Sequence, residues 1–314
     1  MHYKCRKIDR FDKINRFDKI SAMKRFFIAI LSLIFFSSLS IVDSFAAKKL
    51  LFEKAPKELS SFSSIRNAVF APSKNSNNVG RALVISPTCD GLRSDGKTNG
   101  DYRAWIKFFV NEGYTVLMLD HYNQRNIDGL SNGCGLDSKR KLMTNYDLPI
   151  DVLDAVEHLS MMPGVDKNKI FAIGFSLGTM ANAYVASKNW YETFGDKRLR
   201  PRAAGGLYGA CLMGPAKRVL NTDVDIPVFW LMGSKDIETP PSDCLPIIKG
   251  IEDRKETKIY WHIYEGATHC WDCASKNGHS RYMPWNGKTT TYIYNSKYAK
   301  DSMQRALDFF NSFK

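Results

Sequence analysis

The fold class can be inferred from the segment Lys169-Ile-Phe-Ala-Ile-Gly-Phe-Ser-Leu-Gly-Thr-Met-Ala181. Its apolar first half has the pattern of a buried strand, and its second half, rich in small residues, has the pattern of a helix. Between them lies Gly-x-Ser-x-Gly at 174–178, a motif that forms a turn so tight that the serine is held in strained dihedral angles. Glycines on both sides leave room for the neighbouring strand and helix. The stretch therefore predicts a reactive serine, Ser176, exposed where a strand ends and a helix begins.

Strand and helix patterns alternate on both sides of this motif. Short apolar runs predict strands over 82–86, 115–119, 170–173, 203–208, 227–232 and 259–264. Helical periodicity appears over 102–111, 150–161, 177–187 and 302–313. The runs at 116–119 and 228–232 are apolar without alternation, as expected for strands that are buried on both faces. The pattern predicts a mainly parallel sheet between two layers of helices, which is a three-layer α/β fold.

A serine hydroxyl needs a general base and a carboxylate to act as a nucleophile at neutral pH. In α/β folds with this motif the three residues follow the order serine, acid, histidine. After Ser176, two predicted strands run into loops that carry Asp236 and His269, at the sheet edge where ligand sites form. Asp236 is the expected acid, with Glu238 as the alternative. His269 is the expected base, with His279 as the alternative.

Acyl transfer through such a serine also needs two backbone N–H groups that stabilise the oxyanion of the tetrahedral intermediate. One comes from the residue after the nucleophile, here Leu177, and the other from the loop after an early strand. The segment Ser86-Pro-Thr-Cys-Asp-Gly91 occupies that place, so the N–H of Cys89 is the expected second donor. The alternative is that this segment forms only a Pro/Gly turn. Together these residues predict acyl transfer to water with no cofactor.

Length and composition fit a globular protein. The chain has 314 residues, of which 44% are hydrophobic and 25% are charged, with 21 Gly and 12 Pro. These values exclude collagen-like, low-complexity and wholly disordered classes. The N-terminal region is distinct, because an apolar run over 26–42 follows Lys24-Arg25 and ends in Ser44-Phe-Ala46. This is the pattern of a secretory signal peptide with a small-residue cleavage site, and an uncleaved membrane anchor is the alternative.

The leader sets the expected domain organisation. We expect an N-terminal extension at 1–22 upstream of a true start, a signal peptide at 23–46 and a single domain at 47–314 that is exported to a periplasm or secreted. The first 46 residues carry nine Lys/Arg and four Asp/Glu, so the net charge of +13 falls to +8 without them. No Lys/Arg cluster is interleaved with aromatic residues, so we expect no nucleic-acid partner. Contact with a membrane is expected only through the leader during export.

Export would allow the cysteines of the chain to form disulfides. Six of the seven lie after the leader, namely Cys89, Cys134, Cys211, Cys244, Cys270 and Cys273. An even number in an exported chain suggests disulfides, and six cysteines allow 15 pairings. Cys270 and Cys273 also have zinc-like spacing beside His269 and His279, so a metal or redox site is the alternative there. Zinc would occupy the base that Ser176 needs, so we expect a disulfide or free thiols and no metal.

The chain resembles the dienelactone hydrolase family of α/β-hydrolases, particularly its exported members, from about Arg81 to Phe313. The motifs that carry the resemblance are the turn at 89–92, the stretch at 113–125, the elbow at 174–178 and the segments at 233–240 and 264–269. The resemblance implies an α/β-hydrolase fold with the triad at Ser176, Asp236 and His269, in agreement with the order of residues. It also implies two disulfide pairs.

The implied disulfides are Cys89–Cys134 and Cys211–Cys244, which leave Cys270 and Cys273 as a Cys-x-x-Cys pair. Pro87-Thr88 replaces the His-Gly that usually precedes the oxyanion turn of the family. Ser176 replaces the cysteine nucleophile of the namesake enzymes. Ester hydrolysis is therefore a better expectation than action on dienelactone itself.

Substrate contacts are expected from the stretch after the second predicted strand, at 115–119. Arg125 and Tyr122 are candidates to bind a substrate carboxylate, because a guanidinium offers a bidentate fork. A structural ion pair is the alternative for Arg125. The expected function is hydrolysis of small-molecule carboxylic esters or lactones through an acyl-enzyme. The alternatives are a peptidase or acyltransferase with the same triad, a non-catalytic binding protein on an inherited fold, and a metal-binding envelope protein.

Overall fold

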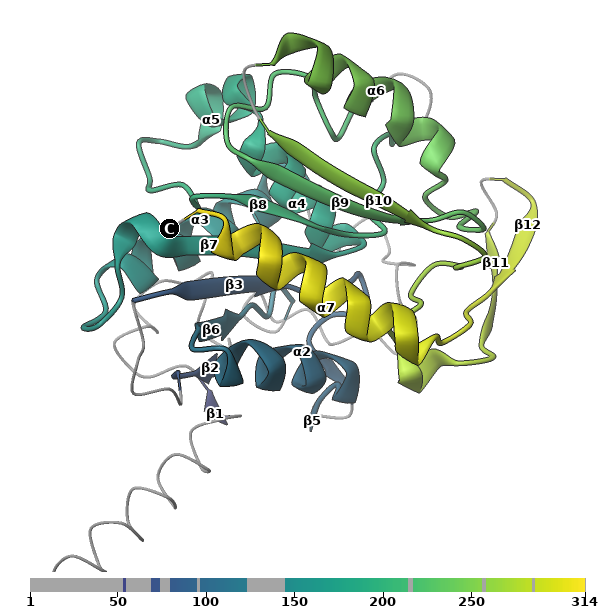
Figure 1. The fold of residues 1–314 in the computed structure, drawn as a ribbon, viewed down its shortest axis with the longest axis horizontal. Coiled ribbons are helices and arrows are strands. Elements are labelled where there is room, and N and C mark those ends of the chain that lie inside the picture. Colours follow the sequence, from purple (N-terminus) through teal and green to yellow (C-terminus); the bar gives the residue numbers. More distant parts are fainter. Residues whose placement is uncertain are drawn as a thin grey trace, which may run out of the picture. The chain divides into compact units, whose positions relative to one another are not determined.

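A central sheet of eight strands organises the fold of the protein (Figure 1). The computed structural model describes residues 53–54, 69–73, 80–94, 97–122, 145–213, 217–255, 258–283 and 286–313. In spatial order the strands are β1 (Glu53–Lys54), β2 (Val69–Ala71), β6 (Thr115–Met118), β3 (Ala82–Ser86), β7 (Ile170–Phe175), β8 (Ala204–Leu207), β9 (Val228–Gly233) and β10 (Ile259–Tyr264). The six strands from β6 to β10 are parallel, and β1 and β2 extend the sheet in antiparallel pairing. The predicted mainly parallel sheet is confirmed.

Helices cover both faces of this sheet. One face carries α2 (Gly100–Asn111) and α7 (Ser296–Asn311), which lie in front of the sheet in Figure 1. The other face carries α3 (Asp147–Ser160), α4 (Leu177–Ala186), α5 (Lys188–Phe194) and α6 (Pro241–Arg254). Within the ranges given above, no helix combines the length and apolar character needed to cross a membrane. The three-layer α/β architecture is confirmed.

The hydrophobic core lies in two halves, one on each side of the sheet. Along β9, Val228, Trp230 and Met232 face the layer of α3, α4 and α6, whereas Phe229 and Leu231 face α2 and α7. All five side chains are at most 1% exposed. Because successive residues of a strand point to opposite faces, burial of both faces leaves no polar positions. This explains the continuous apolar runs in the sequence.

Several elements differ from the sequence-based expectation. Asn99 and Asn295 cap α2 and α7 through their side-chain oxygens, so both helices begin before their apolar periodicity does. Helix α6 was not predicted, since prolines at 241 and 246 obscure its pattern. The two-stranded sheets β4–β5 (Arg93–Ser94, Lys97–Thr98) and β11–β12 (Ser280–Met283, Lys288–Thr291) were not predicted either.

Parallel pairing brings the carboxyl ends of the strands to one edge of the sheet. Ser176 follows β7, Asp236 lies three residues after β9, and His269 lies five residues after β10. The strand β8 lies between β7 and β9, and β10 is next to β9. The sheet order therefore places all three loops on the same side of the molecule.

Candidate active site

Ser176 lies at a strained turn between β7 and α4. Its φ is 50° and its ψ is −108°, a conformation that residues other than glycine rarely adopt. The backbone N–H of Ser176 donates to the carbonyl of Leu207 at 3.0 Å, which ties the turn to β8. The local geometry is that of a nucleophile elbow.

Close backbone contacts explain the two glycines of the motif. A Cβ at Gly174 would lie 2.2 Å from the carbonyl carbon of Gly178. A Cβ at Gly178 would lie 2.2 Å from the carbonyl oxygen of Ser86, at the end of β3. Neither position has room for a side chain, so the glycines let α4 approach β3 and β7.

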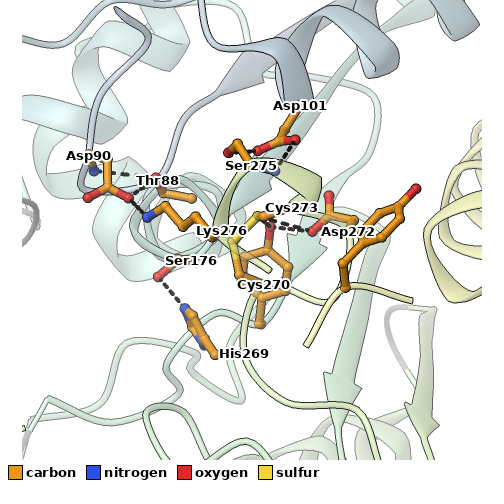
Figure 2. The surroundings of a disulfide bond; sticks show 12 residues. Thr88, Asp90, Asp101, Ser176, His269, Cys270, Asp272, Cys273, Ser275 and Lys276 are labelled. Carbon is orange, nitrogen blue, oxygen red and sulfur yellow. Dashed lines mark hydrogen bonds and ion pairs between the residues drawn. A yellow bond between two sulfur atoms is a disulfide. The ribbon is translucent and has the colours of Figure 1, made fainter. Parts of the chain in front are cut away.

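The imidazole of His269 connects Ser176 to Asp236. Its Nε2 lies 3.1 Å from Oγ of Ser176, and its Nδ1 lies 2.7 Å from Oδ2 of Asp236. Figure 2 shows the His269 ring directed at the Ser176 hydroxyl. The side chains of His269 and Asp236 are 7% and 0% exposed, so this contact is shielded from water. His269 therefore lies within hydrogen-bond distance of both Ser176 and Asp236, in the order that proton transfer requires.

Asp236 is held by three further donors. Its Oδ1 accepts from the backbone N–H groups of Glu238 at 2.9 Å and Thr239 at 3.0 Å. Its Oδ2 accepts from the hydroxyl of Thr239 at 2.8 Å. These bonds fix the carboxylate that faces Nδ1 of His269, so the imidazole has a defined orientation.

The charges around His269 favour its protonated form. Burial lowers the pKa of His269, but the negative charges of Asp236 and Glu238 and the hydrogen bond to Asp236 outweigh that effect. The positive charge of Lys276 acts in the opposite direction and is the weakest of these influences. The net result is a pKa above the ordinary histidine value of 6.5.

The alternative acid and base have other surroundings. The Glu238 carboxylate forms an ion pair with Arg281 at 3.5 Å, whereas His269 bonds to Asp236. His279 is exposed and begins the turn into β11, where its backbone N–H donates to the carbonyl of Lys276. The arrangement therefore favours Asp236 and His269 over Glu238 and His279.

The expected oxyanion donors lie on two segments that meet at the elbow. Leu177 is the first residue of α4, where a backbone N–H has no acceptor within the helix. Cys89 lies in a turn closed by a 2.9 Å bond from Gly91 N–H to the carbonyl of Thr88. The start of this turn packs on α4, because a Cβ added at Gly178 would lie 2.2 Å from the carbonyl oxygen of Ser86 and 2.8 Å from that of Pro87.

An ion pair joins the Cys89 turn to the loop that carries His269. The ammonium of Lys276 contacts Oδ2 of Asp90, and Figure 2 shows this side chain reaching across to the Thr88–Asp90 segment. Nearby, the backbone N–H of Ser275 donates to Asp101 at the start of α2, at 3.2 Å. The loop after His269 is thus fastened to both neighbouring segments.

Two disulfides are present in the described part of the chain. Cys211 and Cys244 are bonded with a Cα–Cα distance of 5.1 Å, as the resemblance implied, and Cys244 lies in α6. Cys270 and Cys273 are bonded with a Cα–Cα distance of 5.3 Å (Figure 2). Cys134 lies outside the described residues, so the pair with Cys89 stays a prediction.

One group of potential metal ligands occurs in the described ranges, formed by Cys270, Asp272 and Cys273. Their ligand atoms lie within 4.8 Å of one another. The two sulfurs are bonded to each other, and the two oxygens of Asp272 accept hydrogen bonds from Trp105 and Tyr208. His269 does not belong to this group, so the arrangement favours the disulfide over the metal alternative.

The two expected substrate contacts have different outcomes. Tyr122 is 1% exposed, and its ring packs under the turn, 2.8 Å from where a Cβ of Gly91 would lie. Burial raises the pKa of its hydroxyl. Arg125 lies outside the described residues, and its role stays a prediction.

A second serine–histidine–aspartate arrangement was missed by the sequence analysis. The hydroxyl of Ser86 lies 2.6 Å from Nε2 of His121, and Nδ1 of His121 lies 2.6 Å from Oδ2 of Asp151. The three residues are at most 1% exposed. They connect the ends of β3 and β6 to α3 beneath the Cys89 turn, so their burial suits a structural network.

A parallel α/β sheet with a serine elbow, and with an aspartate and a histidine in the loops that follow later strands, defines an α/β-hydrolase. The model of the dienelactone hydrolase family matches residues 67–314. The chain belongs to the dienelactone hydrolase family, and it is a hydrolase that acts on ester bonds.

Solved structures share this fold at low sequence identity. A thermophilic esterase of Thermogutta terrifontis with bound butyrate is similar with a TM-score of 0.56 and 14% identity, covering 78% of this chain and 88% of that chain. A dienelactone hydrolase-like promiscuous phosphotriesterase from metagenomic libraries is similar with a TM-score of 0.55 and 16% identity. The match covers 78% of this chain and 92% of that chain. A search of curated proteins finds no match to the chain.

Proposed function

We propose that the protein is a serine hydrolase that cleaves small carboxylic esters or lactones through an acyl-enzyme. The observation that carries the proposal is the continuous path from Ser176 Oγ through His269 to Asp236, with distances of 3.1 and 2.7 Å. A nucleophile, a base and a group that orients the base are the parts that acyl transfer needs. None of the proposed steps uses a cofactor.

The first half of the reaction forms the acyl-enzyme. Nε2 of His269 accepts the proton of the Ser176 hydroxyl as Oγ attacks the ester carbonyl. Nδ1–H of His269 donates to Asp236, which stabilises the imidazolium that forms. The N–H groups of Leu177 and Cys89 donate to the oxyanion of the tetrahedral intermediate. His269 then gives its proton to the leaving alcohol.

The second half releases the acid. Water loses a proton to Nε2 of His269 and attacks the acyl carbonyl, and a second oxyanion forms at the same site. When this intermediate collapses, His269 returns the proton to Oγ of Ser176. The esterase of similar fold holds butyrate, so a short acyl chain is our first choice of substrate.

A labelling experiment tests the proposal on residues 47–314. We expect a fluorophosphonate to label the protein at Ser176, and we expect turnover of p-nitrophenyl butyrate. Ser176→Ala should abolish both signals, whereas Ser160→Ala, in α3, should leave both unchanged. Turnover of peptides or transfer to an alcohol, with little ester hydrolysis, would favour the peptidase or acyltransferase alternatives. Absence of labelling in the folded wild-type protein would refute the proposal.

We also propose that the domain at 47–314 acts after export. The two disulfides at Cys211–Cys244 and Cys270–Cys273 support this, because disulfides form and persist outside the reducing cytosol. N-terminal sequencing of the protein recovered from a periplasmic fraction or culture medium tests it. A start at Ala47 is expected, and a protein that keeps residues 23–46 would contradict cleavage.

A further inference from the structure

Asp272 is a buried carboxylate three residues after the proposed base, and the proposed reaction gives it no role. Its exposed fraction is 8%, and the rings of Trp105 and Tyr208 that bond to it are 1% exposed. Burial raises the pKa of its carboxyl to about 6, although hydrogen bonds from Tyr208 and Trp105 oppose this effect. A buried charge is costly unless other contacts offset it. We therefore examined what the contacts of Asp272 do for the neighbouring active site.

Two donors from different elements fix the carboxylate. Trp105, in α2, donates through Nε1 to Oδ2 at 2.9 Å, and the hydroxyl of Tyr208 donates to Oδ1 at 2.7 Å. The indole of Trp105 is itself immobilised, because it stacks on Phe109 and meets Phe175 edge to face. Asp272 thus connects Tyr208 to a rigid part of the core.

Tyr208 supports both the base and the acid of the proposed triad. Its ring centroid lies 4.7 Å from that of His269. Its backbone carbonyl lies 3.1 Å from the hydroxyl of Thr239, and that hydroxyl lies 2.8 Å from Oδ2 of Asp236. A shift of the Tyr208 side chain would remove the surface against which the imidazole packs.

The disulfide loop links Asp272 back to His269. Cys270 follows His269 directly and is bonded to Cys273, so Asp272 lies inside a ring that begins next to the base. Figure 2 shows the disulfide beside Lys276, with Asp272 on its far side from Ser176. The segment that carries the imidazole therefore also carries the group that holds the wall of its pocket.

We propose that Asp272 is a positioning residue for His269. It holds the Tyr208 hydroxyl so that the Tyr208 ring keeps Nε2 of His269 aligned with Ser176 and Nδ1 aligned with Asp236. Proton transfer requires such alignment, because a displacement of about 1 Å can lower a rate by about 100-fold. This inference rests on the proposed function, since it assigns His269 the role of general base.

Four variants test the inference. Asp272→Leu removes both acceptors at similar volume, and Tyr208→Phe removes only the hydroxyl. We expect each to lower kcat for p-nitrophenyl butyrate by about 10- to 100-fold and to change KM by less than about threefold. Asp272→Asn should keep kcat within about threefold of wild type, because its amide can accept from Trp105 and donate to the Tyr208 hydroxyl. Tyr114→Phe is the matched control, since it loses a 3.0 Å hydrogen bond to Asn311 in a buried place remote from the site.

A pH profile separates positioning from general loss of packing. The charges that act on His269 are those of Asp236, Glu238 and Lys276. If the His269–Asp236 contact loosens, the pKa of His269 falls towards its ordinary value. The acid limb of kcat/KM should therefore move to lower pH in Tyr208→Phe and stay in place in Tyr114→Phe. The double variant Asp272→Leu/Tyr208→Phe should be no slower than the slower single variant, because both act through one contact.

The outcomes distinguish this inference from the proposed function. Failure of a fluorophosphonate to label wild-type Ser176 would refute the proposed function. Normal labelling and turnover of wild type together with unchanged kcat in Tyr208→Phe would overturn the inference and leave the proposed function intact. The inference would also be overturned if the kcat losses of Asp272→Leu and Tyr208→Phe multiply in the double variant while the acid limb of kcat/KM stays in place. Should Asp272→Leu fail to fold by circular dichroism, Tyr208→Phe and Asp272→Asn carry the test.

Discussion

Nε2 of His269 lies 3.1 Å from Oγ of Ser176, although 93 positions separate the two residues in the chain. The contact arises because each residue follows the carboxyl end of a strand in one parallel sheet. Asp236 follows a third strand, β9, which is next to β10 and separated from β7 only by β8. Sheet order thus converts distant sequence positions into a hydrogen-bonded set.

Removing Ser176 or Asp236, the two residues at the ends of this hydrogen-bonded set, should abolish most activity. We expect Ser176→Ala and Asp236→Asn each to lower kcat for p-nitrophenyl butyrate by about 10⁴-fold or more. Asp236→Asn acts by favouring the wrong tautomer of His269. Steady-state kinetics on variants with unchanged thermal midpoints measures the effect, and a loss below tenfold in Ser176→Ala would exclude it as the nucleophile.

The acid limb of kcat/KM should lie above pH 6.5, because the pKa of free-enzyme His269 is raised. Two substitutions should move the limb in opposite directions. Glu238→Gln removes a negative charge that raises this pKa, so the limb should move to lower pH. Lys276→Gln removes a positive charge that lowers it, so the limb should move to higher pH. Shifts in the same direction would show that another group controls the profile.

Gly178→Ala should be strongly destabilising, because its Cβ would lie 2.2 Å from the carbonyl oxygen of Ser86. The backbone of α4 would have to move away from β3, and kcat should fall with stability. Gly164→Ala is the control. Gly164 has a φ of +81° but no atom within 4 Å of the added Cβ, so only backbone strain of about 1–3 kcal/mol is expected. Urea unfolding compares them, and equal losses would contradict the steric explanation.

His121→Leu should lower the free energy of unfolding by about 2–4 kcal/mol. The variant leaves the Ser86 hydroxyl and the Asp151 carboxylate without the imidazole that lies 2.6 Å from each. Ser86→Ala removes only the hydroxyl that lies next to His121 and should lower the free energy of unfolding by about 1 kcal/mol. Urea titration of the intact domain measures both. A His121→Leu variant as stable as wild type would show that the network contributes little.

Asp272→Asn should raise stability in a pH-dependent way. The folded-state pKa of Asp272 is about 6 and its ordinary value is 3.8, so ionisation opposes folding. The wild type loses stability as pH rises from 3.8 through 6, and the variant does not. Above pH 7 the variant should be more stable by about 3 kcal/mol, and this advantage should vanish near pH 4. An advantage that does not change with pH would contradict a raised pKa.

The sequence was sufficient for the parts of the fold that depend on local patterns. β3 and β10 have the predicted bounds, and the elbow at Ser176 has the predicted strained conformation. The loops of Asp236 and His269 were found because the order of residues and the ends of strands constrain them. These features need no knowledge of which strands are neighbours.

Other features depend on contacts that no local pattern reports. His121 precedes Ser176, so the order serine, acid, histidine gave no reason to connect it with Ser86 and Asp151. Asp272 drew attention only as part of a Cys-x-x-Cys segment. Its bonds to Trp105 and Tyr208 span 167 and 64 positions and bring together α2, the end of β8 and the loop after β10. A carboxyl group buried in this way looks in the sequence like an ordinary surface residue.

The late position of β9 and β10 has a consequence for biosynthesis. The proposed nucleophile, Ser176, is translated well before the segments that complete its surroundings, since His269 comes 93 residues later. A nascent or partly threaded chain that ends before residue 269 has a serine with no imidazole to deprotonate it. The proposed triad can therefore form only after the segment that carries β9 and β10 has been translated.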